Sequence, residues 1–432
     1  MNAGRQASPG LSVLVRRPGE EPTVLHTGLA SLEHQSAIGP DTTFNTGSVA
    51  KQITAHLVLL AARDNFFHLG QRAAGLLPRL KISDVTVADL VTHQSGIRDV
   101  ESLLSLAGFR DLDHYTVDDL RTLAYRQHQR AVLEGRFLYS NTNYLLLAEI
   151  LETLYDTSLA DLARSRVFVP LGMNNTHFKA DPRHVIAGAT SAYQAADHGW
   201  QHTEAPVTLP GPGSLWTTAD DLHRWLTHLH QSWQLECRLP GQDVLDYGPS
   251  DHQPYLYGPG LYADARPGRA AVFHYGHEQG FSAATHVDAT GLRVVCLSND
   301  ASTAADHVLA VILRDLRERP EPDAVDLLRQ ATSPHRTTRA DRTRPRSVGR
   351  DRGPHAELGT FTCDQAPGSL RLTRSADTLH LWRRGTRDQL TQAGPTVYTG
   401  DGYTLTLTGD TNQVDRFTLD LDRAPGLTYI RQ

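Results

Sequence analysis

Two residues near the start of the chain, Ser48 and Lys51, have the types and the spacing that covalent catalysis needs. Residues at positions i and i+3 of a helix share a face and lie within reach of each other. A serine hydroxyl is a weak nucleophile until a neighbouring base takes its proton, and a lysine amine is that base in the Ser-Lys variant of the catalytic triad. The pair therefore indicates an acyl-enzyme at Ser48, although an N-capping serine beside an exposed helix lysine has the same spacing.

Lysine is rare in this sequence, since only Lys51, Lys81 and Lys179 occur among 42 lysines and arginines. Arginine is effectively always protonated, whereas lysine can be tuned to lose its proton. A chain that uses arginine almost everywhere still has lysine at position 51, where an amine base would be needed. If Ser48 lies in the first turn of a helix, the free N–H groups and the helix dipole there would also favour its alkoxide.

The segment Tyr139-Ser140-Asn141 lies in a polar break immediately before an apolar helical run. Tyr139 could hold a proton near Ser48, and Asn141 could donate a hydrogen bond to a substrate carbonyl. Taken alone, a tyrosine at this place is more typical of packing at the start of a helix.

The segment His274-Tyr275-Gly276 stands at the end of an expected strand. A glycine at a strand edge lets a bound ligand approach the backbone closely, so Gly276 is a candidate substrate-binding residue. A single histidine such as His274 would by itself more often be structural.

In this order and spacing, the three segments resemble the β-lactamase-related serine hydrolases. That family groups class C β-lactamases, DD-peptidase-type penicillin-binding proteins, D-aminopeptidases and certain esterases. The resemblance extends over residues 9–315. Further segments agree with it: Thr43-Phe44, Leu90-Val91-Thr92-His93-Gln94-Ser95-Gly96-Ile97, Pro170-Leu171-Gly172-Met173, and Gly213-Ser214-Leu215-Trp216-Thr217-Thr218 followed by Asp220-Asp221-Leu222.

The resemblance implies a role for each candidate residue. Ser48 would attack a carbonyl carbon, while Lys51 and Tyr139 share its proton and later pass one to the leaving group. The backbone N–H groups of Ser48 and His277 would form the oxyanion hole, which donates to the tetrahedral oxygen. Asn141 would orient the substrate amide or ester.

His274 departs from the family pattern, because many relatives have the lysine of a Lys-Thr-Gly motif at this position. That lysine supplies a permanent positive charge suited to the carboxylate of β-lactams, whereas a histidine is mostly neutral at pH 7. We therefore expect esters, amides or peptides of D-amino acids as substrates rather than efficient β-lactam hydrolysis. We also hypothesise that His274 helps to polarise the Tyr139 site.

The elements that position these residues follow an α+β plan, with an antiparallel sheet flanked by helices plus a helical subdomain, as in β-lactamases and transpeptidases. Strands are expected at both ends of this part of the chain and helices between them. The expected strands are a hairpin at 11–30 and the runs 271–273, 282–287 and 292–297; the expected helices are 48–63, 86–94, 116–129, 143–154, 158–166, 218–230 and 302–317.

The sequence divides into a hydrolase domain at 1–318, a Pro- and Arg-rich linker at 319–355 and a β-type domain at 356–432. The linker could form one short helix at 324–330. The last part alternates like about eight short strands of a small antiparallel β-barrel. It resembles the lipocalin-like domain of some family members, including D-aminopeptidases and stand-alone penicillin-binding-protein-type thioesterases of nonribosomal peptide assembly. A generic barrel without substrate contact is the alternative.

The composition excludes several classes of partner. A net charge of -6 and a pI near 6.4 predict no affinity for nucleic acid or anionic membranes. Three widely spaced cysteines and the lack of a secretory or membrane-spanning run favour a cytoplasmic protein. We expect no cofactor and no metal, because no phosphate loop occurs and nothing completes a metal site around the helical histidines His223, His228 and His230.

The sequence thus predicts a serine hydrolase that forms an acyl-enzyme at Ser48 and cleaves an ester, an amide or a peptide containing D-amino acids. One alternative is a thioesterase or acyltransferase that releases or macrocyclises a nonribosomal peptide, with a carrier-bound or activated thioester or ester as substrate. Another alternative is a binding protein for β-lactams or peptides that acylates and turns over slowly.

Overall fold

A computed structural model describes residues 7–109, 113–203, 207–236, 248–266, 268–318, 356–376, 378–409 and 413–432. Its contacts divide the chain into two compact units. The first contains Met1–Leu69 and Leu147–Arg339, and the second contains Gly70–Leu146 and Ala340–Gln432. The expected linker, its short helix at 324–330 and Cys237 lie outside the described residues, and the division at 318 and 355 stays a prediction.

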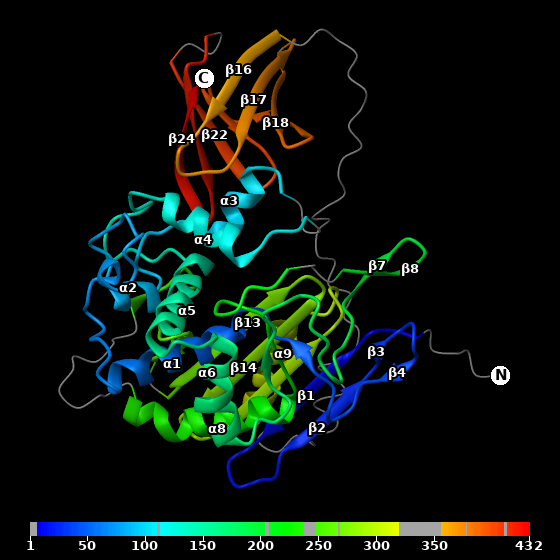
Figure 1. Ribbon diagram of the computed structural model, residues 1–432. Coiled ribbons are helices and arrows are strands. Elements are labelled where there is room, and N and C mark those ends of the chain that lie inside the picture. The colour runs from blue at the N-terminus through cyan, green and yellow to red at the C-terminus, as the bar shows by residue number, and fades with distance from the viewer. Residues whose placement is uncertain are drawn as a thin grey trace. The chain divides into compact units, whose positions relative to one another are not determined.

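An eight-stranded antiparallel sheet forms the centre of the first unit (Figure 1). Its order is β10 (Gly248–Pro249), β11 (Leu256–Gly258), β12 (Leu261–Asp264), β13 (Ala271–Glu278), β14 (Phe281–Asp288), β15 (Arg293–Ser298), β1 (Leu11–Arg16) and β2 (Thr23–Thr27). The expected hairpin and the three later strands are thereby confirmed. β13 is longer than the sequence predicts, however, so His274 lies in the middle of a strand and not at its end.

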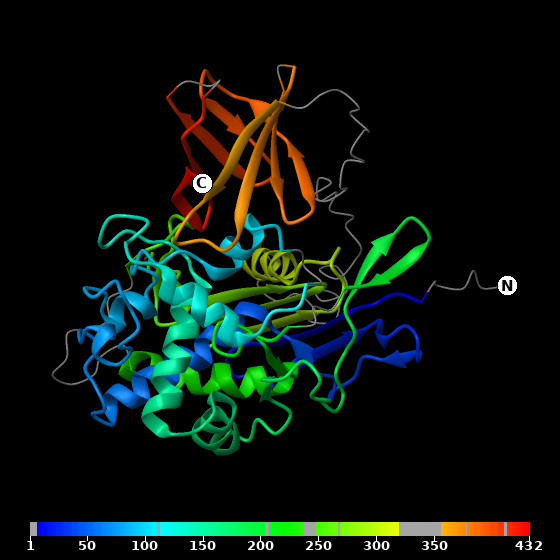
Figure 2. The ribbon, with the colours of Figure 1, turned by 45° about the horizontal axis from the view of Figure 1, so that its top comes forward.

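Side-chain alternation gives this sheet two buried faces. Leu11, Val13 and Val15 of β1 pack with α9 (Ala305–Glu318) in one cluster. The intervening residues point to the other face, which α8 (Ala219–Glu236) covers (Figure 2). Because successive residues of a strand point to opposite faces, helices on both sides explain why β1 is buried along nearly its whole length.

The segment that carries Ser48 follows a small three-stranded sheet of β5 (Phe44–Asn45), β9 (Leu215–Thr217) and β6 (His177–Phe178). A helix was expected to begin at Ser48, but the structure begins with a 3-10 turn at Gly47–Ala50, and α1 runs from Lys51–Arg63. Such turns are frequent at the ends of α-helices. Gly47 starts the turn with a φ of 48°, a conformation that favours glycine.

The remaining expected helices are present, some shorter and others longer than expected. Asn141 is the first residue of α5 (Asn141–Tyr155) and does not lie in a break before it. The sequence does not predict α3 (Val100–Leu106) or the short α7 (Val169–Leu171); α3 begins at an N-cap formed by Asp99. Together, these helices are α2 (Val87–Val91), α3 (Val100–Leu106), α4 (Val117–Arg126), α5 (Asn141–Tyr155), α6 (Leu159–Ala163) followed by a π-turn at Arg164–Phe168, and α7 (Val169–Leu171). The short hairpins are β3 (Leu29–Ser31) with β4 (Ser36–Ala37), and β7 (Tyr193–Ala196) with β8 (Gly199–His202).

The C-terminal part of the second unit is a nearly closed antiparallel barrel of nine strands among the described residues (Figure 1). The two edge strands, β19 and β20, are separated only by Leu390, so the sheet curls back on itself. Leu103 and Leu106 of α3 belong to the barrel's hydrophobic core. The strands are β16 (Ala356–Thr362), β17 (Ser369–Ser375), β18 (Thr378–Arg383), β19 (Thr386–Gln389), β20 (Thr391–Gln392), β21 (Val397–Thr399), β22 (Tyr403–Thr408), β23 (Arg416–Leu421) and β24 (Ala424–Arg431).

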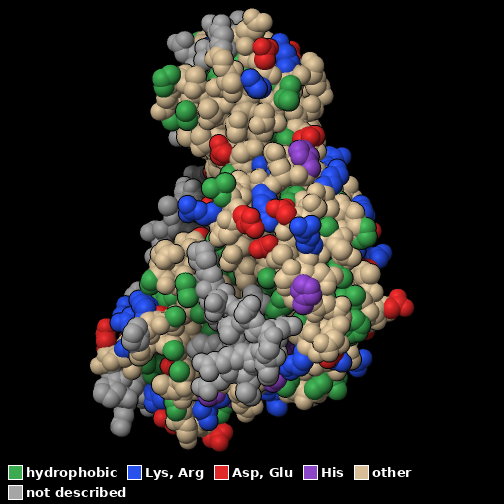
Figure 3. Space-filling model, turned by 90° about the vertical axis from the view of Figure 1, so that its left-hand side faces the viewer, with side chains coloured by type: hydrophobic (Ala, Val, Ile, Leu, Met, Phe, Trp, Pro, Cys, Tyr) green, Lys and Arg blue, Asp and Glu red, His purple; other side chains and the backbone are tan. Residues whose placement is uncertain are grey.

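The described surface is mixed in charge. On the face drawn in Figure 3, basic and acidic side chains lie interspersed. Among the described helices, none combines the length and the apolar composition that crossing a lipid bilayer would require.

Candidate active site

Ser48 and Lys51 are joined by a hydrogen bond. The Lys51 Nζ atom lies 2.9 Å from the Ser48 Oγ atom, so the proximity expected from their spacing is present. The Lys51 side chain is 0% exposed, and its amine also donates to the carbonyl oxygen of Pro212 at 2.9 Å. Both of these acceptors are uncharged. The amine is thus fixed against the serine hydroxyl and is itself shielded from bulk water.

The stretch from Gly211 to Thr217 holds this part of the site in place. The Thr54 hydroxyl of α1 donates to the Gly211 carbonyl at 2.8 Å, and Thr46 donates to the Leu215 carbonyl through both its backbone N–H and its hydroxyl. β9 also pairs with β5 just before the serine turn. The Gly-Ser-Leu-Trp-Thr-Thr segment noted in the sequence therefore supports the turn that presents Ser48.

The edge of β13 lies directly against the serine turn. A methyl group added to Gly276 would lie 1.8 Å from the Thr46 carbonyl oxygen and 2.9 Å from the Ser48 backbone nitrogen. A methyl group added to Gly47 would lie 2.9 Å from the His277 backbone nitrogen. Only glycines allow so close an approach. The backbones of Ser48 and His277 are thereby brought together, as an oxyanion hole requires.

His274 is buried within the same sheet. It is 1% exposed, its Nε2 atom lies 3.2 Å from the Tyr257 hydroxyl, and its Nδ1 atom lies 2.6 Å from the Tyr275 carbonyl oxygen. Since a carbonyl only accepts, Nδ1 carries the proton. Burial, together with the positive charge of Lys51, lowers the pKa of His274 to about 3. The imidazole is therefore neutral at pH 7.

Tyr139 lies in the second unit and is 7% exposed. Its ring packs against the ring of His93, with the two centres 4.3 Å apart. The guanidinium carbon of Arg423, which comes from the turn between β23 and β24 of the barrel, lies 4.7 Å from the centre of the Tyr139 ring. The tyrosine ring thus contacts both an imidazole and a cation.

The turn at residues 92–96 holds the Tyr139 segment through its backbone. His93 has a φ of 57°, which is unusual for a residue other than glycine. Its Nδ1 atom accepts from the Ser140 backbone N–H at 3.2 Å, and its carbonyl accepts from the Leu138 N–H at 2.8 Å. The Ser95 hydroxyl donates to Asn143 at 2.7 Å. The Thr-His-Gln-Ser-Gly segment noted in the sequence is therefore a scaffold for Tyr139.

Two carboxylates fix Asn141. Its backbone N–H donates to Asp99 at 2.6 Å, and its side-chain amide nitrogen donates to the Glu101 carboxylate. With that nitrogen engaged, the Oδ1 atom is oriented away from Glu101 as an acceptor. Burial lowers the pKa of the Arg423 guanidinium, but Asp99 and, next in strength, Tyr139 and Glu101 raise it, so the net shift is upward and Arg423 supplies a positive charge here.

Sequence reasoning missed Asp99, Glu101 and Arg423. No local signal identifies the two acidic residues as anything more than the start of a helix, and Arg423 is one arginine among many in a β-type region. The structure brings Ser48, Lys51, His274, Gly276 and His277 together within the first unit, and it brings Tyr139 and Asn141 together within the second.

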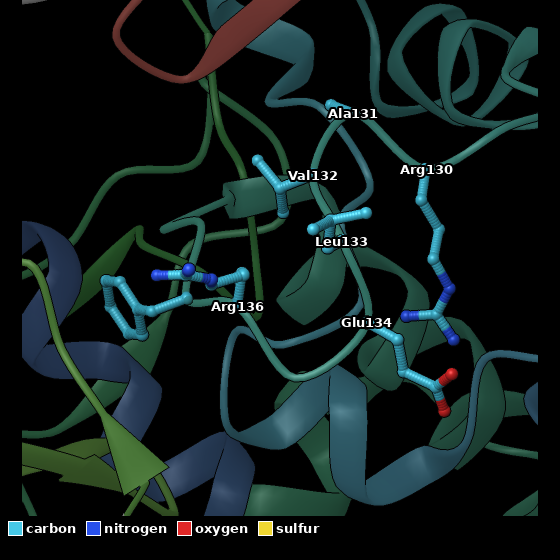
Figure 4. A pocket seen from close by; sticks show the side chains of 7 residues that line it. Arg130, Ala131, Val132, Leu133, Glu134 and Arg136 are labelled. Carbon is cyan, nitrogen blue, oxygen red and sulfur yellow. The ribbon is translucent and has the colours of Figure 1, made fainter.

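A pocket with a volume of about 710 Å³ is formed by the loop at 130–137 (Figure 4). The Arg130 guanidinium donates to the carbonyls of Gln94 and Ser95, which anchors the loop to the 92–96 turn. None of the residues that the sequence predicts for the site lines this pocket. Its lining is Arg130, Ala131, Val132, Leu133, Glu134, Arg136 and Phe137.

A second pocket, with a volume of only about 10 Å³, lies beside the serine turn. It is lined in part by Asn45, whose side-chain oxygen accepts from the Gly47 N–H at 3.0 Å. Lys179, another of the chain's rare lysines, places its amine 5.5 Å from the centre of the Trp216 ring in the same pocket. The pocket is small in this conformation and has room for about one water molecule.

Comparisons with known proteins identify the family of the chain. Residues 2–318 match the beta-lactamase family. A D-aminopeptidase from Gluconobacter oxydans is 27% identical over 320 residues, which are 72% of this chain and 60% of the relative. The chain thus spans less than two thirds of that relative's length.

Two solved structures show the fold. The D-amino acid amidase from Ochrobactrum anthropi SV3, complexed with L-phenylalanine amide, aligns with a TM-score of 0.58 and 22% identity over 67% of this chain and 86% of its own. The protein SurE aligns with a TM-score of 0.61 and 21% identity over 99% of this chain and 95% of its own. The latter alignment includes the C-terminal barrel.

Proposed function

The chain belongs to the beta-lactamase family of serine hydrolases, and on this basis we propose that it cleaves an amide or ester through an acyl-enzyme at Ser48. The observation that carries the proposal is the hydrogen bond of 2.9 Å between the buried Lys51 amine and the Ser48 hydroxyl. Once it has given up its own proton, the Lys51 amine at that distance can take the hydroxyl proton as the oxygen attacks the substrate carbonyl. The new C–O bond and the proton on Lys51 leave a tetrahedral oxyanion.

The backbone N–H groups of Ser48 and His277 are the proposed donors to that oxyanion. The close approach of Gly276 to Thr46 supports this assignment, because it leaves no room for a side chain between the two segments. Tyr139 is proposed to pass a proton to the leaving group, and Asn141 to orient the substrate. Collapse of the tetrahedral species breaks the bond to the leaving group, and attack of water on the acyl-Ser48 ester then restores the serine.

As substrates we propose amides or short peptides of D-amino acids. The D-aminopeptidase relative and the fold shared with a D-amino acid amidase support this class. The neutral, buried His274 supports it as well, because it supplies no fixed cation for a substrate carboxylate. We therefore propose that β-lactams are poor substrates.

Intact-mass spectrometry after reaction with a fluorophosphonate probe tests the acyl-enzyme. The native protein should gain one adduct, and Ser48→Ala should gain none. Ser12→Ala is a suitable control, since Ser12 is a serine of β1 outside the serine turn. Labelling that survives in Ser48→Ala would refute the proposal.

Product analysis determines whether water or an amine attacks the acyl-enzyme. Incubation of a D-amino acid amide with and without an added D-amino acid amide acceptor should give mainly the free acid if water attacks. A ligated dipeptide as the main product would instead indicate a transferase, which corresponds to the thioesterase or acyltransferase alternative.

A further inference from the structure

Four basic side chains converge where the sheet of the first unit meets α8. Arg16 is the last residue of β1 and Arg293 is the first residue of β15, and the two are direct partners in the antiparallel register. Their neighbours Val15 and Val294 point to the α9 face, so both arginines point to the face that α8 covers. Like charges directly opposite each other on one face of a sheet are destabilising.

α8 adds two histidines at the same place. His223 and His230 are seven residues apart, which places them on one side of the helix two turns from each other. A methyl group added to Gly291, in the turn before β15, would lie 3.4 Å from the His230 Nε2 atom and 3.9 Å from the Arg16 Nη1 atom. The turn at Gly291 is thus flanked by a guanidinium from the sheet and an imidazole from the helix.

Arg293 has no counterion among the residues that the structure describes. Its side chain is buried, with the residue only 6% exposed, and its Nε–H has no hydrogen-bond acceptor. The His223 Nε2 atom is also buried and has no hydrogen-bond partner in the described part of the chain. A buried guanidinium without an anion is costly, because burial removes its hydration and nothing replaces it.

Two acidic side chains nearby are paired with other arginines, and Asp288 of the Gly291 turn accepts from the Leu292 N–H at 3.1 Å. Asp220, which is close enough to influence His223, forms an ion pair with Arg224 at 3.1 Å. Glu20 pairs with Arg17 at 3.7 Å. Burial is the main cause that lowers the pKa of His223, and the charge of Arg293 is the next. Burial and, next, the charge of Arg16 lower the pKa of Arg293. The cluster therefore carries an excess of positive charge.

We propose that Arg16, His223, His230 and Arg293 form a binding site for a phosphate-type oxyanion. Guanidinium groups match the tetrahedral oxygens of phosphate and donate two hydrogen bonds at once, and imidazole nitrogens can donate to the remaining oxygens. The ligand would be inorganic phosphate or the phosphate group of a monoester. This site lies outside the serine chemistry and does not depend on the proposed function.

Thermal unfolding of the full chain tests the site. Inorganic phosphate and phenyl phosphate are each titrated against sodium chloride of matched ionic strength. Because a ligand that binds only the folded state stabilises it by mass action, Tm should rise with phosphate but not with chloride. Binding of inorganic phosphate alone identifies a closed site for the free ion, and binding of both identifies a site open to monoesters.

Arg293→Gln should raise the dissociation constant for phosphate by roughly 10-fold or more, because the site loses a charged hydrogen-bond donor. The rise in Tm is compared within each variant, so a change in basal stability does not obscure it, and cooperative unfolding shows that the variant is folded. Arg314→Gln is the matched control, since Arg314 on α9 is exposed and has Asp315 beside it. No phosphate-specific rise in the native protein, or an equal rise in Arg293→Gln, overturns the proposal.

Discussion

The guanidinium carbon of Arg423 lies 4.7 Å from the centre of the Tyr139 ring. A side chain from the C-terminal barrel therefore contacts a tyrosine that the family resemblance assigns to proton transfer. The backbone follows the same connection, because the Asp99 N–H donates to the Arg423 carbonyl at 3.0 Å. Asp99 in turn accepts from the Asn141 N–H. The barrel thus contributes both charge and backbone contacts to the Tyr139–Asn141 segment.

Arg423→Gln should lower kcat by up to about 30-fold with little change in KM, since a desolvated cation–π contact contributes about 2 kcal/mol. Arg423→Lys should restore part of the loss, because lysine keeps the charge but not the planar group. Steady-state kinetics on a D-amino acid amide provide the measurement. Arg416→Gln, an exposed arginine of β23, is the control. A KM effect alone, or no rescue by lysine, would show that Arg423 does not act on Tyr139 through its charge.

The sequence was sufficient for features encoded locally. The spacing of Ser48 and Lys51 predicted their proximity, and alternation predicted the strands of the barrel. It was insufficient for contacts between distant segments. Arg423 meets Tyr139 across nearly 300 residues, and no periodicity marks an arginine in a turn. The extra length of β13 was also missed, because its last residues, from His274 to Glu278, are mostly polar although the strand continues through them.

Lys51→Met should reduce the rate of labelling by the fluorophosphonate by about 10³-fold, which is the usual effect of losing a general base. The fold should tolerate the change, because replacing a buried charged group by an apolar one of similar size is often neutral or stabilising. Lys81→Met is the matched control, since Lys81 is exposed. A rate within a few-fold of the native protein's would remove Lys51 from the role of base.

Gly276→Ala should disturb the approach of β13 to the serine turn. The added methyl group would lie 1.8 Å from the Thr46 carbonyl oxygen, so the two backbones must separate. Overpacking of this kind costs about 1–3 kcal/mol of stability, and labelling of Ser48 should slow. Gly39→Ala serves as the control, because a methyl group there meets nothing within 4 Å. Unaltered labelling and Tm in Gly276→Ala would contradict the assignment of the oxyanion hole to Ser48 and His277.

His274 should make the folded protein less stable in acid. Burial and the charge of Lys51 lower its pKa to about 3, whereas in the unfolded chain it titrates near 6.5. Between these values the unfolded state binds a proton that the folded state does not. Stability therefore falls as the pH drops from about 6.5 towards 3, by up to about 1.4 kcal/mol per pH unit. Urea unfolding at several pH values should show this slope diminished in His274→Gln.

His286 separates this effect on stability from a role in catalysis. It is also buried, and burial lowers its pKa to about 4, so His286→Gln should likewise diminish the acid dependence of stability. His286 is outside the proposed machinery, so this variant should keep its activity at pH 7. His274→Gln should lose activity at the same pH if the neutral imidazole polarises the Tyr139 site. Equal activity in the two variants would restrict His274 to a structural role, in which its hydrogen bonds to Tyr257 and the Tyr275 carbonyl serve only the sheet.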